Sequence, residues 1–323
     1  MNVLLKQLLV AIASLGAFAS SSFGQGYPIK PVRIFVGYPP GGVPDFIART
    51  IGQALSQTFG QQFVVENKPS AGGIVATESV AKAAPDGHTL LSGETGQIEA
   101  VSYIFKSLPF DPYKDLTPIS LVGISPGIFV SSSKSQIGTI KDLIREAKAN
   151  PGKLNYGSSG VGSIHHILWE AFSAAAGVKL THIPFKGASL TLPALLAGEV
   201  QVMMASLGVV NAQRQAGTIN LLGVTSAERF PFLPDVPAIA DDLKGFDFAS
   251  ETGIFAPAGL PADVLAKISK AMKAAIETPE MQDRYKKLGL ILVWTTPEAY
   301  RERIRRNMKK YEQVIRTANI QAN

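Results

Sequence analysis

The sequence contains no cysteine and only four histidines among its 323 residues. Without cysteine the chain can form no disulfide, hold no thiolate-bound metal and carry no lipid on a thioether. Low-complexity tracts and repeats of fixed period are also missing, which argues against a solenoid or a long disordered region. Apolar cores must therefore hold the chain together, and its length and its hydrophobic fraction of 46% suffice for two domains.

Charge is scarce at the start of the chain. Lys6 is the only charged residue in positions 1–24, and it precedes an apolar stretch at 8–13 and small residues up to Ser22. This order predicts a secretory signal peptide over residues 1–24, with cleavage after either Ala19 or Gly24. The apolar stretch is short beside the roughly 20 residues of a membrane-spanning helix. We therefore expect an exported protein that works in the periplasm after its signal peptide is removed.

The formal net charge is +6, and much of the positive excess lies near the C-terminus. The residues concerned are Arg301, Arg303, Arg305, Arg306, Lys309 and Lys310. Apolar residues recur among them at helical spacing, which predicts an amphipathic helix over 297–317 with a solvated basic face. Nucleic-acid binding would be the alternative, but an exported protein has little access to nucleic acid, so we expect no such partner.

Strand-like and helix-like segments alternate along almost the whole chain. Strands are predicted at 32–36, 63–65, 89–91, 119–122, 128–130, 154–156, 180–183, 200–203, 221–225 and 253–256. Helices are predicted at 44–58, 73–83, 139–150, from 164 onward, and at 262–277, 280–288 and 297–317. Such alternation indicates an α/β protein with parallel strands and helices on both faces of its sheets, and its recurrence indicates two units.

Three loops rich in glycine or serine follow predicted strands and precede helices, at 37–45, 92–97 and 157–163. In open α/β sheets, ligands bind at the carboxyl ends of the strands, where the first N–H groups of the helices are unpaired. Turn chemistry alone would explain any one of these loops. Their common position in both units predicts an anion site in a cleft between the units.

No catalytic motif is present in these loops. Loop 157–163 lacks the Lys-Ser/Thr of a P-loop and the spacing of a dinucleotide-binding loop, and Val161 breaks the nucleophile-elbow pattern. His165 and His166 are adjacent, so they point about 100° apart on a helix and cannot share one metal. We expect one of them to hydrogen-bond within the loops and the other to lie on the surface. The sequence therefore predicts a binding protein that is not an enzyme and holds no metal or cofactor.

Short motifs run through essentially all of the mature chain in a fixed order. They occupy residues 27–33, 39–42 with Asp45 and 48–49, 64–69, 71–73, 84–90, 108–112, 150–156, 158–160 with 162–163 and His166, 184–187, 224–226, 233–237 and 255–259. In these motifs the chain resembles the Bug/TctC solute receptors of tripartite tricarboxylate transporters.

The resemblance implies a two-lobed periplasmic-binding-protein fold of type II, a Venus flytrap with two crossing strands. Lobe 1 would comprise residues 25–122 and 252–323, and lobe 2 residues 123–251, with crossings near Gly123 and Glu251. It also implies capture of a small organic carboxylate and delivery to membrane permease subunits, by a protein expected to be a monomer. A ligand-sensing receptor that presents its closed form to a periplasmic sensor domain remains the alternative.

Carried over by motif, the ligand-binding residues fall on both lobes. In lobe 1 they are Tyr38, Pro40, Gly41, Gly42, Pro44, Asp45, Gly93, Glu94, Thr95 and Gly96. In lobe 2 they are Ser158, Ser159, Gly160, Ser163, His166, Lys186, Gly187, Ala205 and Ser206, with Glu251 at a crossing strand.

Three of these positions depart from the family pattern. Ala205-Ser206 stands where many relatives carry Asp-Asn, Glu251 where many carry an aromatic residue, and Glu94 where small or hydroxyl residues are common. Our hypothesis is that Glu94 or Glu251 hydrogen-bonds a donor on the ligand, such as an ammonium, an amide or a protonated ring nitrogen. A solvated loop carboxylate is the alternative for each, because charged residues are seldom buried unless they are paired.

Overall fold

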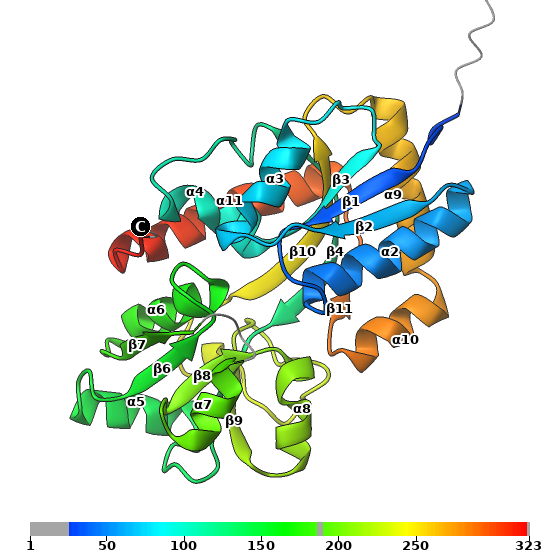
Figure 1. The fold of residues 1–323 in the computed structure, drawn as a ribbon. Helices are drawn as coiled ribbons and strands as arrows, with labels where there is room; N and C mark the ends of the chain where they lie inside the picture. The colour runs from blue at the N-terminus through cyan, green and yellow to red at the C-terminus, as the bar shows by residue number, and fades with distance from the viewer. Residues whose placement is uncertain (1–25, 186–189, 322–323) are drawn as a thin grey trace, which may run out of the picture.

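The computed structural model describes residues 26–185 and 190–321, which form two lobes, each built on a mixed β-sheet (Figure 1). The larger sheet has six strands in the order β11-β4-β10-β3-β1-β2, and the smaller has five in the order β7-β6-β8-β5-β9. This arrangement confirms the predicted two-lobed α/β fold. Within the described residues, no helix is both long enough and apolar enough to cross a membrane.

The larger lobe is assembled from the two ends of the described chain. Its first part contains β1 (Val32–Val36), α2 (Val43–Phe59), β2 (Phe63–Asn67), α3 (Ile74–Ala81), β3 (Thr89–Glu94), a π-helical turn (Gly96–Ala100), α4 (Val101–Ile104) and β4 (Leu116–Pro126). Its second part contains β10 (Ala249–Pro257), α9 (Ala262–Ile276), α10 (Pro279–Lys287), β11 (Ile291–Leu292) and α11 (Pro297–Thr317). Strands β1, β2 and β3 are parallel, so their carboxyl ends meet at one edge.

The smaller lobe lies between these two parts in the sequence. It contains β5 (Ile128–Ser132), α5 (Ile140–Ala149), β6 (Asn155–Ser158), α6 (Ile164–Ala176), β7 (Thr181–Pro184), α7 (Thr191–Ala197), β8 (Val202–Ala205), α8 (Leu207–Gln215) and β9 (Ile219–Val224). Strands β6, β7 and β8 are parallel to one another, and β5 runs against both β8 and β9.

Two long antiparallel strands connect the lobes. β4 pairs with β10 from Leu116 opposite Pro257 to Pro126 opposite Ala249, and β5 begins two residues after β4 ends. Thr225 of the smaller lobe hydrogen-bonds the chain next to both strands. Its hydroxyl accepts from the N–H of Gly127, just after β4, at 2.8 Å and donates to the carbonyl of Phe248, just before β10, at 2.7 Å. The polypeptide thus passes between the lobes through a short, hydrogen-bonded connection.

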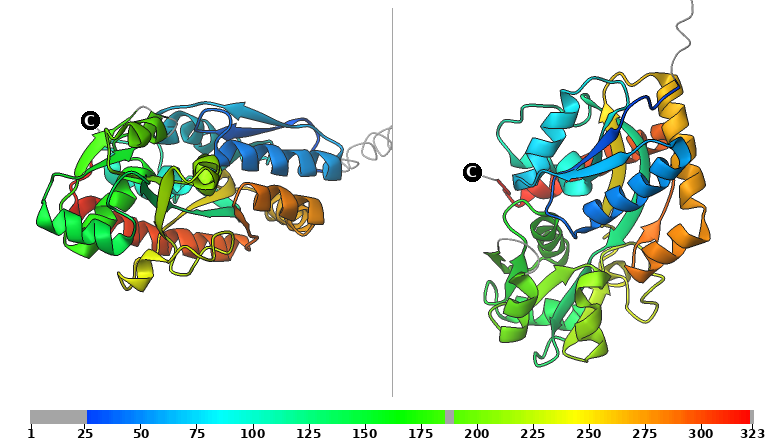
Figure 2. Two further views of the ribbon diagram at one scale, coloured as in Figure 1. Left: turned by 90° about the horizontal axis from the view of Figure 1, so that it is seen from below. Right: turned by 45° about the vertical axis from the view of Figure 1, so that its right-hand side comes forward.

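Helix α11 packs against both lobes (Figure 2). Tyr300 and Ile304 lie in an apolar cluster of the larger lobe, whereas Tyr311 and Ile315 pack in the cluster that contains Trp169 of the smaller lobe. The predicted amphipathic helix is therefore present. The prediction that its basic face is solvated is wrong in part. Arg303 and Lys310 are half-buried, because each bonds a group on or next to β10.

Candidate ligand-binding site between the lobes

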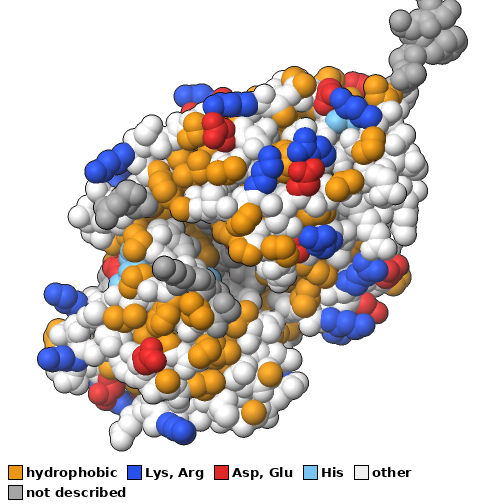
Figure 3. Space-filling model, in the orientation of Figure 1, with side chains coloured by type: hydrophobic (Ala, Val, Ile, Leu, Met, Phe, Trp, Pro, Cys, Tyr) orange, Lys and Arg blue, Asp and Glu red, His pale blue; other side chains and the backbone are white. Residues whose placement is uncertain are grey.

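A space-filling view shows the surface hollowed between the two lobes (Figure 3). The lobes also touch at two points where glycine permits a close approach. A Cβ atom at Gly162 of the smaller lobe would lie 2.8 Å from Ile104 of α4, and one at Gly289 of the larger lobe would lie 2.7 Å from Leu207 of α8. The loops at the starts of α6 and α8 therefore reach the larger lobe, as a cleft-forming arrangement requires.

The first predicted loop, residues 37–45, leads from β1 into α2. Its tip at Pro40, Gly41 and Gly42 is exposed, whereas Pro44 and Asp45 are buried at the helix start. The first N–H group that α2 itself pairs is that of Phe46, which donates to the carbonyl of Gly42, so the helix leaves the N–H groups of Val43 and Asp45 open. The loop therefore presents the positive end of α2 at the carboxyl edge of the larger sheet.

Asp45 holds this loop in shape. Its carboxylate accepts hydrogen bonds from the N–H of Gly41 at 3.0 Å, from Arg49 at 2.9 and 3.0 Å, and from the side chain of Asn67 at 2.9 Å. Burial alone would raise the pKa of Asp45, but the hydrogen bonds from Arg49, Gly41 and Asn67 outweigh it and hold the pKa below its usual value. Sequence reasoning missed Asn67, which also donates to the carbonyl of Tyr38 at 3.0 Å.

The prediction of a loop at residues 92–97 is wrong, because residues 92–94 belong to β3, which pairs there with β10, and a helical stretch begins at Thr95. The residues of this segment have different roles. Gly93 packs against Ile98, and the buried hydroxyl of Thr95 accepts from the N–H of Glu251 at 2.9 Å. Glu94 is half-exposed, and a Cβ atom at Gly96 would lie 3.2 Å from its Oε1. Space beside the Glu94 carboxylate therefore depends on glycine at position 96.

Glu94 accepts hydrogen bonds from two hydroxyls. The Tyr38 hydroxyl donates to Oε1 at 2.6 Å, and the Ser250 hydroxyl of β10 donates to Oε2 at 3.3 Å. Burial raises the pKa of Glu94 above its usual value, and the two hydrogen bonds only partly oppose this. The carboxylate is thus fixed at the carboxyl edge of the larger sheet, beside a strand that connects the lobes.

Glu251 has an internal partner. Its carboxylate is buried and accepts two hydrogen bonds from Arg303 of α11, at 2.6 and 2.7 Å. Glu99 of the π-helical turn lies nearby, is 1% exposed and accepts from Asn307 at 3.3 Å. Burial first and then the Glu251 charge raise the pKa of Glu99 well above its usual value. Of the two glutamates in our hypothesis, only Glu94 is half-exposed.

On the smaller lobe, serines shape the loop between β6 and α6. Ser163 caps α6, since its hydroxyl accepts from the N–H of His166 at 3.3 Å and donates to the carbonyl of Gly160 at 2.7 Å. Buried Ser158 accepts from the N–H of Gly160 at 3.1 Å. The first N–H group that α6 pairs with a backbone carbonyl is that of Ile167, so the N–H groups of Ile164 and His165 stay open within the helix, which leaves the start of α6 able to bind an anion.

Three histidines surround this loop as neutral imidazoles. His165 bonds Ser159 at 2.7 Å, His166 accepts from the N–H of Gly162 at 3.1 Å, and His182 of β7 bonds Ser158 at 2.6 Å. Burial lowers the pKa of each to about 4, and the neighbouring His182 adds to this for His166. The expectation that either His165 or His166 lies on the surface is wrong, because both are at least half-buried and hydrogen-bonded. His182, stacked on His166 with ring centres 3.9 Å apart, was not predicted.

The remaining predicted positions follow β7 and β8. Ala205 is buried at the end of β8, and half-exposed Ser206 precedes α8 without making a side-chain cap. Lys186 and Gly187 lie outside the described residues. The start of α8 is therefore a third helix start beside the hollow, next to the Leu207–Gly289 contact.

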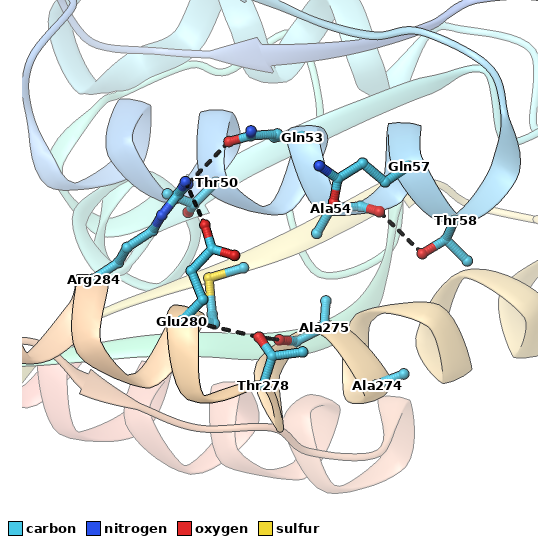
Figure 4. A pocket seen from close by; sticks show the side chains of 11 residues that line it. Thr50, Gln53, Ala54, Gln57, Thr58, Ala274, Ala275, Thr278, Glu280 and Arg284 are labelled. Atoms are coloured by element: carbon cyan, nitrogen blue, oxygen red, sulfur yellow. Dashed lines mark hydrogen bonds and ion pairs between the residues drawn. The ribbon is translucent and has the colours of Figure 1, made fainter.

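Another concavity, of about 210 Å³, lies between α2 and the helices α9 and α10 (Figure 4). Its cation, Arg284, already donates to Gln53 at 2.9 Å and pairs with Glu280 at 2.7 Å. This concavity is lined from the larger lobe alone, so closure of the lobes cannot enclose a guest there. It is a weaker candidate than the hollow between the lobes.

The fold and the helix starts around the hollow define a two-lobed solute-binding receptor. Comparison with known proteins supports this class. Residues 47–320 match the tripartite tricarboxylate transporter family receptor, TctC. A curated relative, the UPF0065 protein in the tcbD-tcbE intergenic region of Pseudomonas sp. strain P51, is 34% identical over 100% of this chain and 97% of its own. The chain belongs to the TctC family of receptors, and it is a solute-binding protein and not an enzyme, as the sequence predicts.

Solved structures of similar proteins agree with the fold. R. palustris Rpa4515 with adipate is 28% identical, with a TM-score of 0.83 over 92% of this chain and 100% of that one. The periplasmic binding protein BugD is 30% identical, with a TM-score of 0.80 over 92% and 100%. MatC from Rhodopseudomonas palustris with bound malate is 29% identical, with a TM-score of 0.79 over 90% and 100%.

Proposed function

We propose that this chain captures a small organic carboxylate between its lobes and delivers it to the membrane permease subunits of a tripartite tricarboxylate-type transporter. The observation that carries the proposal is the position of the starts of α2, α6 and α8. They follow strands of two different sheets, the loops at the starts of α6 and α8 touch the larger lobe, and the surface between the lobes is hollowed (Figure 3). Each offers N–H groups that the helix leaves open, and each carries the positive end of a helix dipole.

Closure of the lobes would strengthen this binding. Removing the guest from water lowers the dielectric around its hydrogen bonds to the N–H groups, which makes each of them stronger. Adipate and malate, bound by two related proteins, are small dicarboxylates. The neutral histidines near the start of α6 can donate or accept hydrogen bonds without adding charge.

The proposed binding residues are those predicted from the sequence, with changed roles for some. Asp45, Thr95, Ser158 and Ser163 position the loops through hydrogen bonds to the chain itself. Open backbone N–H groups and the half-exposed side chains of Tyr38, Glu94, Ser159 and Ser206 would meet the guest. Glu251 is assigned to the ion pair with Arg303 instead.

We also propose the molecular context of this receptor. The chain would be exported with residues 1–24 as a cleaved signal peptide, and the mature protein would be a periplasmic monomer that binds no nucleic acid. Lobe 1 would comprise 25–122 and 252–323, and lobe 2 residues 123–251. The antiparallel ladder between β4 and β10 would then act as the hinge.

Calorimetric titration tests the proposed function. The mature protein, freed of retained ligand by unfolding and refolding, is titrated with malate, adipate, succinate, glutarate and citrate. We expect at least one of these acids to bind with one site per chain, and a ligand at about 100 times its dissociation constant to add roughly 2.7 kcal/mol of stability. If none of these acids releases heat or raises the melting temperature, the proposed function is wrong.

A further inference from the structure

The partly exposed carboxylate of Glu94 is a feature of the larger lobe that capture of a simple carboxylate does not explain. Glu251 and Asp45 are each neutralised by an arginine, Arg303 and Arg49 respectively. In residues 26–185 and 190–321, the groups that donate to Glu94 are the uncharged hydroxyls of Tyr38 and Ser250. A negative group held beside a carboxylate guest would repel it.

The two hydroxyls fix the Glu94 carboxylate without using up its capacity to accept hydrogen bonds. Tyr38 donates to one oxygen at 2.6 Å and Ser250 to the other at 3.3 Å. Each carboxylate oxygen has about two acceptor positions, so one position on each oxygen is left. Gly96 keeps space beside Oε1, because a Cβ atom there would lie 3.2 Å from it.

The smaller lobe presents hydrogen-bond donors to the hollow, in contrast to the Glu94 carboxylate of the larger lobe. Residues 158–163 contain no acidic side chain, and the start of α6 offers the open N–H groups of Ile164 and His165. The three imidazoles beside it are neutral. The hollow thus offers donors on one side and a fixed acceptor on the other, which suits a guest with a carboxylate at one end and a donor at the other.

We propose that Glu94 accepts a hydrogen bond from an N–H group of the ligand, so that the receptor selects small carboxylic acids that also carry an ammonium or amide group. The inference rests on the proposed function and narrows the ligand class of the same site. The donor replaces the water that Glu94 loses when the lobes close, and a charge-assisted hydrogen bond of this kind is stronger than a neutral one.

Matched ligand series test the inference. Succinate, glutarate and adipate are each titrated calorimetrically beside the monoamide of the same length and the amino acid in which an ammonium replaces one carboxylate. The proteins are the wild type, Glu94→Gln, Ser250→Ala and Glu78→Gln. Ser250→Ala removes a donor to Glu94 but keeps the carboxylate, and Glu78 lies partly exposed on α3, paired with Lys82.

We expect the wild type to bind an amide or ammonium member at least about tenfold more tightly than the diacid of the same length. Glu94→Gln should abolish or reverse this preference, because a side-chain amide can donate to the second carboxylate of a diacid. Glu78→Gln should keep the preference, and Ser250→Ala should reduce it without abolishing or reversing it, because Tyr38 still donates to the carboxylate.

Three results would overturn the inference. They are a wild type that binds the diacids at least as tightly, a Glu94→Gln variant that weakens all members of a series equally, and a Ser250→Ala variant that reproduces the Glu94→Gln pattern. The last two results would show that Glu94 has only a structural role, in which it accepts hydrogen bonds from Tyr38 of the loop after β1 and from Ser250 of β10. If no member of any series binds to the wild type while malate or citrate does, the inference fails and the proposed function stands. If malate and citrate do not bind either, both fail.

Discussion

At the scale of single residues, the ion pair between Glu251 and Arg303 fastens a connecting strand to the C-terminal helix. Glu251 lies on β10 close to where the polypeptide passes between the lobes, and Arg303 lies on α11, which packs against both lobes. The carboxylate is 4% exposed, so its charge depends on the arginine for solvation. Removing one partner of such a pair costs more than the pair itself contributes.

We predict that Arg303→Met lowers the free energy of unfolding by about 3 kcal/mol, because it leaves a buried carboxylate without its cation. Arg305→Met is the matched control, since Arg305 pairs with exposed Glu302 one turn away on the same helix. The control should change stability by less than about 0.5 kcal/mol. Urea unfolding measures both, and equal losses in the two variants would contradict the assigned role of the buried pair.

The neutral histidines predict how stability depends on pH. In the folded protein His182 has a pKa of about 4, against about 6.5 in the unfolded chain. Between these values the unfolded chain binds more protons, so the free energy of unfolding falls as the pH falls through this window. His165 and His166 contribute in the same direction.

We therefore expect His182→Gln, which retains a partner for Ser158, to flatten this dependence. The slope of the free energy of unfolding between pH 6 and 4.5 should fall by about 1 kcal/mol per pH unit, somewhat less than the full value for one imidazole because His182 is not fully buried. Urea titrations of both proteins at several pH values measure this. Parallel curves for wild type and variant would show that His182 does not stay neutral in the folded state.

At the scale of elements, we expect the Ser163 cap at the start of α6 to contribute both to the stability of the protein and to carboxylate binding. Ser163 caps α6 much as Thr278 caps α10, where the hydroxyl accepts from the N–H of Met281 at 3.3 Å. Loss of either cap should cost about 1 kcal/mol of stability. Ser163→Ala should in addition weaken carboxylate binding severalfold, because the loop that aims the open N–H groups of α6 loses its anchor.

Thr278→Ala is the matched control for this prediction. Thr278 lines the concavity between α2 and the helices α9 and α10, which is formed by the larger lobe alone (Figure 4). Calorimetry with the acid that binds best should show unchanged affinity in Thr278→Ala. Weaker binding in Thr278→Ala and not in Ser163→Ala would move the ligand site to that concavity.

The sequence predicted most elements because their signals are local. Gly60 and Gly177 end α2 and α6 in left-handed conformations, and apolar periodicity marks α11. Helices α7 and α8 were not predicted. Pro193 lies inside α7, and only Val210 of α8 is buried, so neither segment has a clear periodic pattern.

Contacts between distant parts of the chain could not be predicted. Tyr38 and Glu94 are 56 positions apart, Glu251 and Arg303 are 52 apart, and His182 meets Ser158 from a neighbouring strand. The sequence thus indicated the segments of the proposed site but not which of their polar groups are already paired. Glu94 and Glu251 looked equivalent in the sequence. In the structure Glu251 forms an ion pair with Arg303, whereas Glu94 accepts hydrogen bonds from two hydroxyls.

At the scale of the whole molecule, the approach of the lobes should depend on Gly289. A Cβ atom there would lie 2.7 Å from Leu207 of the other lobe, and Gly289 has a φ of +65°. We predict that Gly289→Ala favours an open arrangement, with a larger radius of gyration in small-angle X-ray scattering and weaker ligand binding.

Gly60→Ala controls for the backbone strain in this experiment. Gly60 has a φ of +68°, and a Cβ atom there would have no neighbour within 4 Å, so the substitution adds a similar strain of roughly 1 kcal/mol without a contact between lobes. The control should lose stability and keep its radius of gyration and affinity. Identical scattering curves for wild type and Gly289→Ala would contradict the proposed contact.

The central claim is that helix starts from both lobes bind one carboxylate guest. Backbone amide NMR of the isotopically labelled mature protein, titrated with the acid that binds best, tests this most directly. The account predicts that the amide resonances of residues 41–46, 159–166 and 207–209 shift together along one saturation curve. The amide resonances around Arg284 should not shift. Shifts confined to one lobe, or centred on the concavity between α2 and α10, would contradict it.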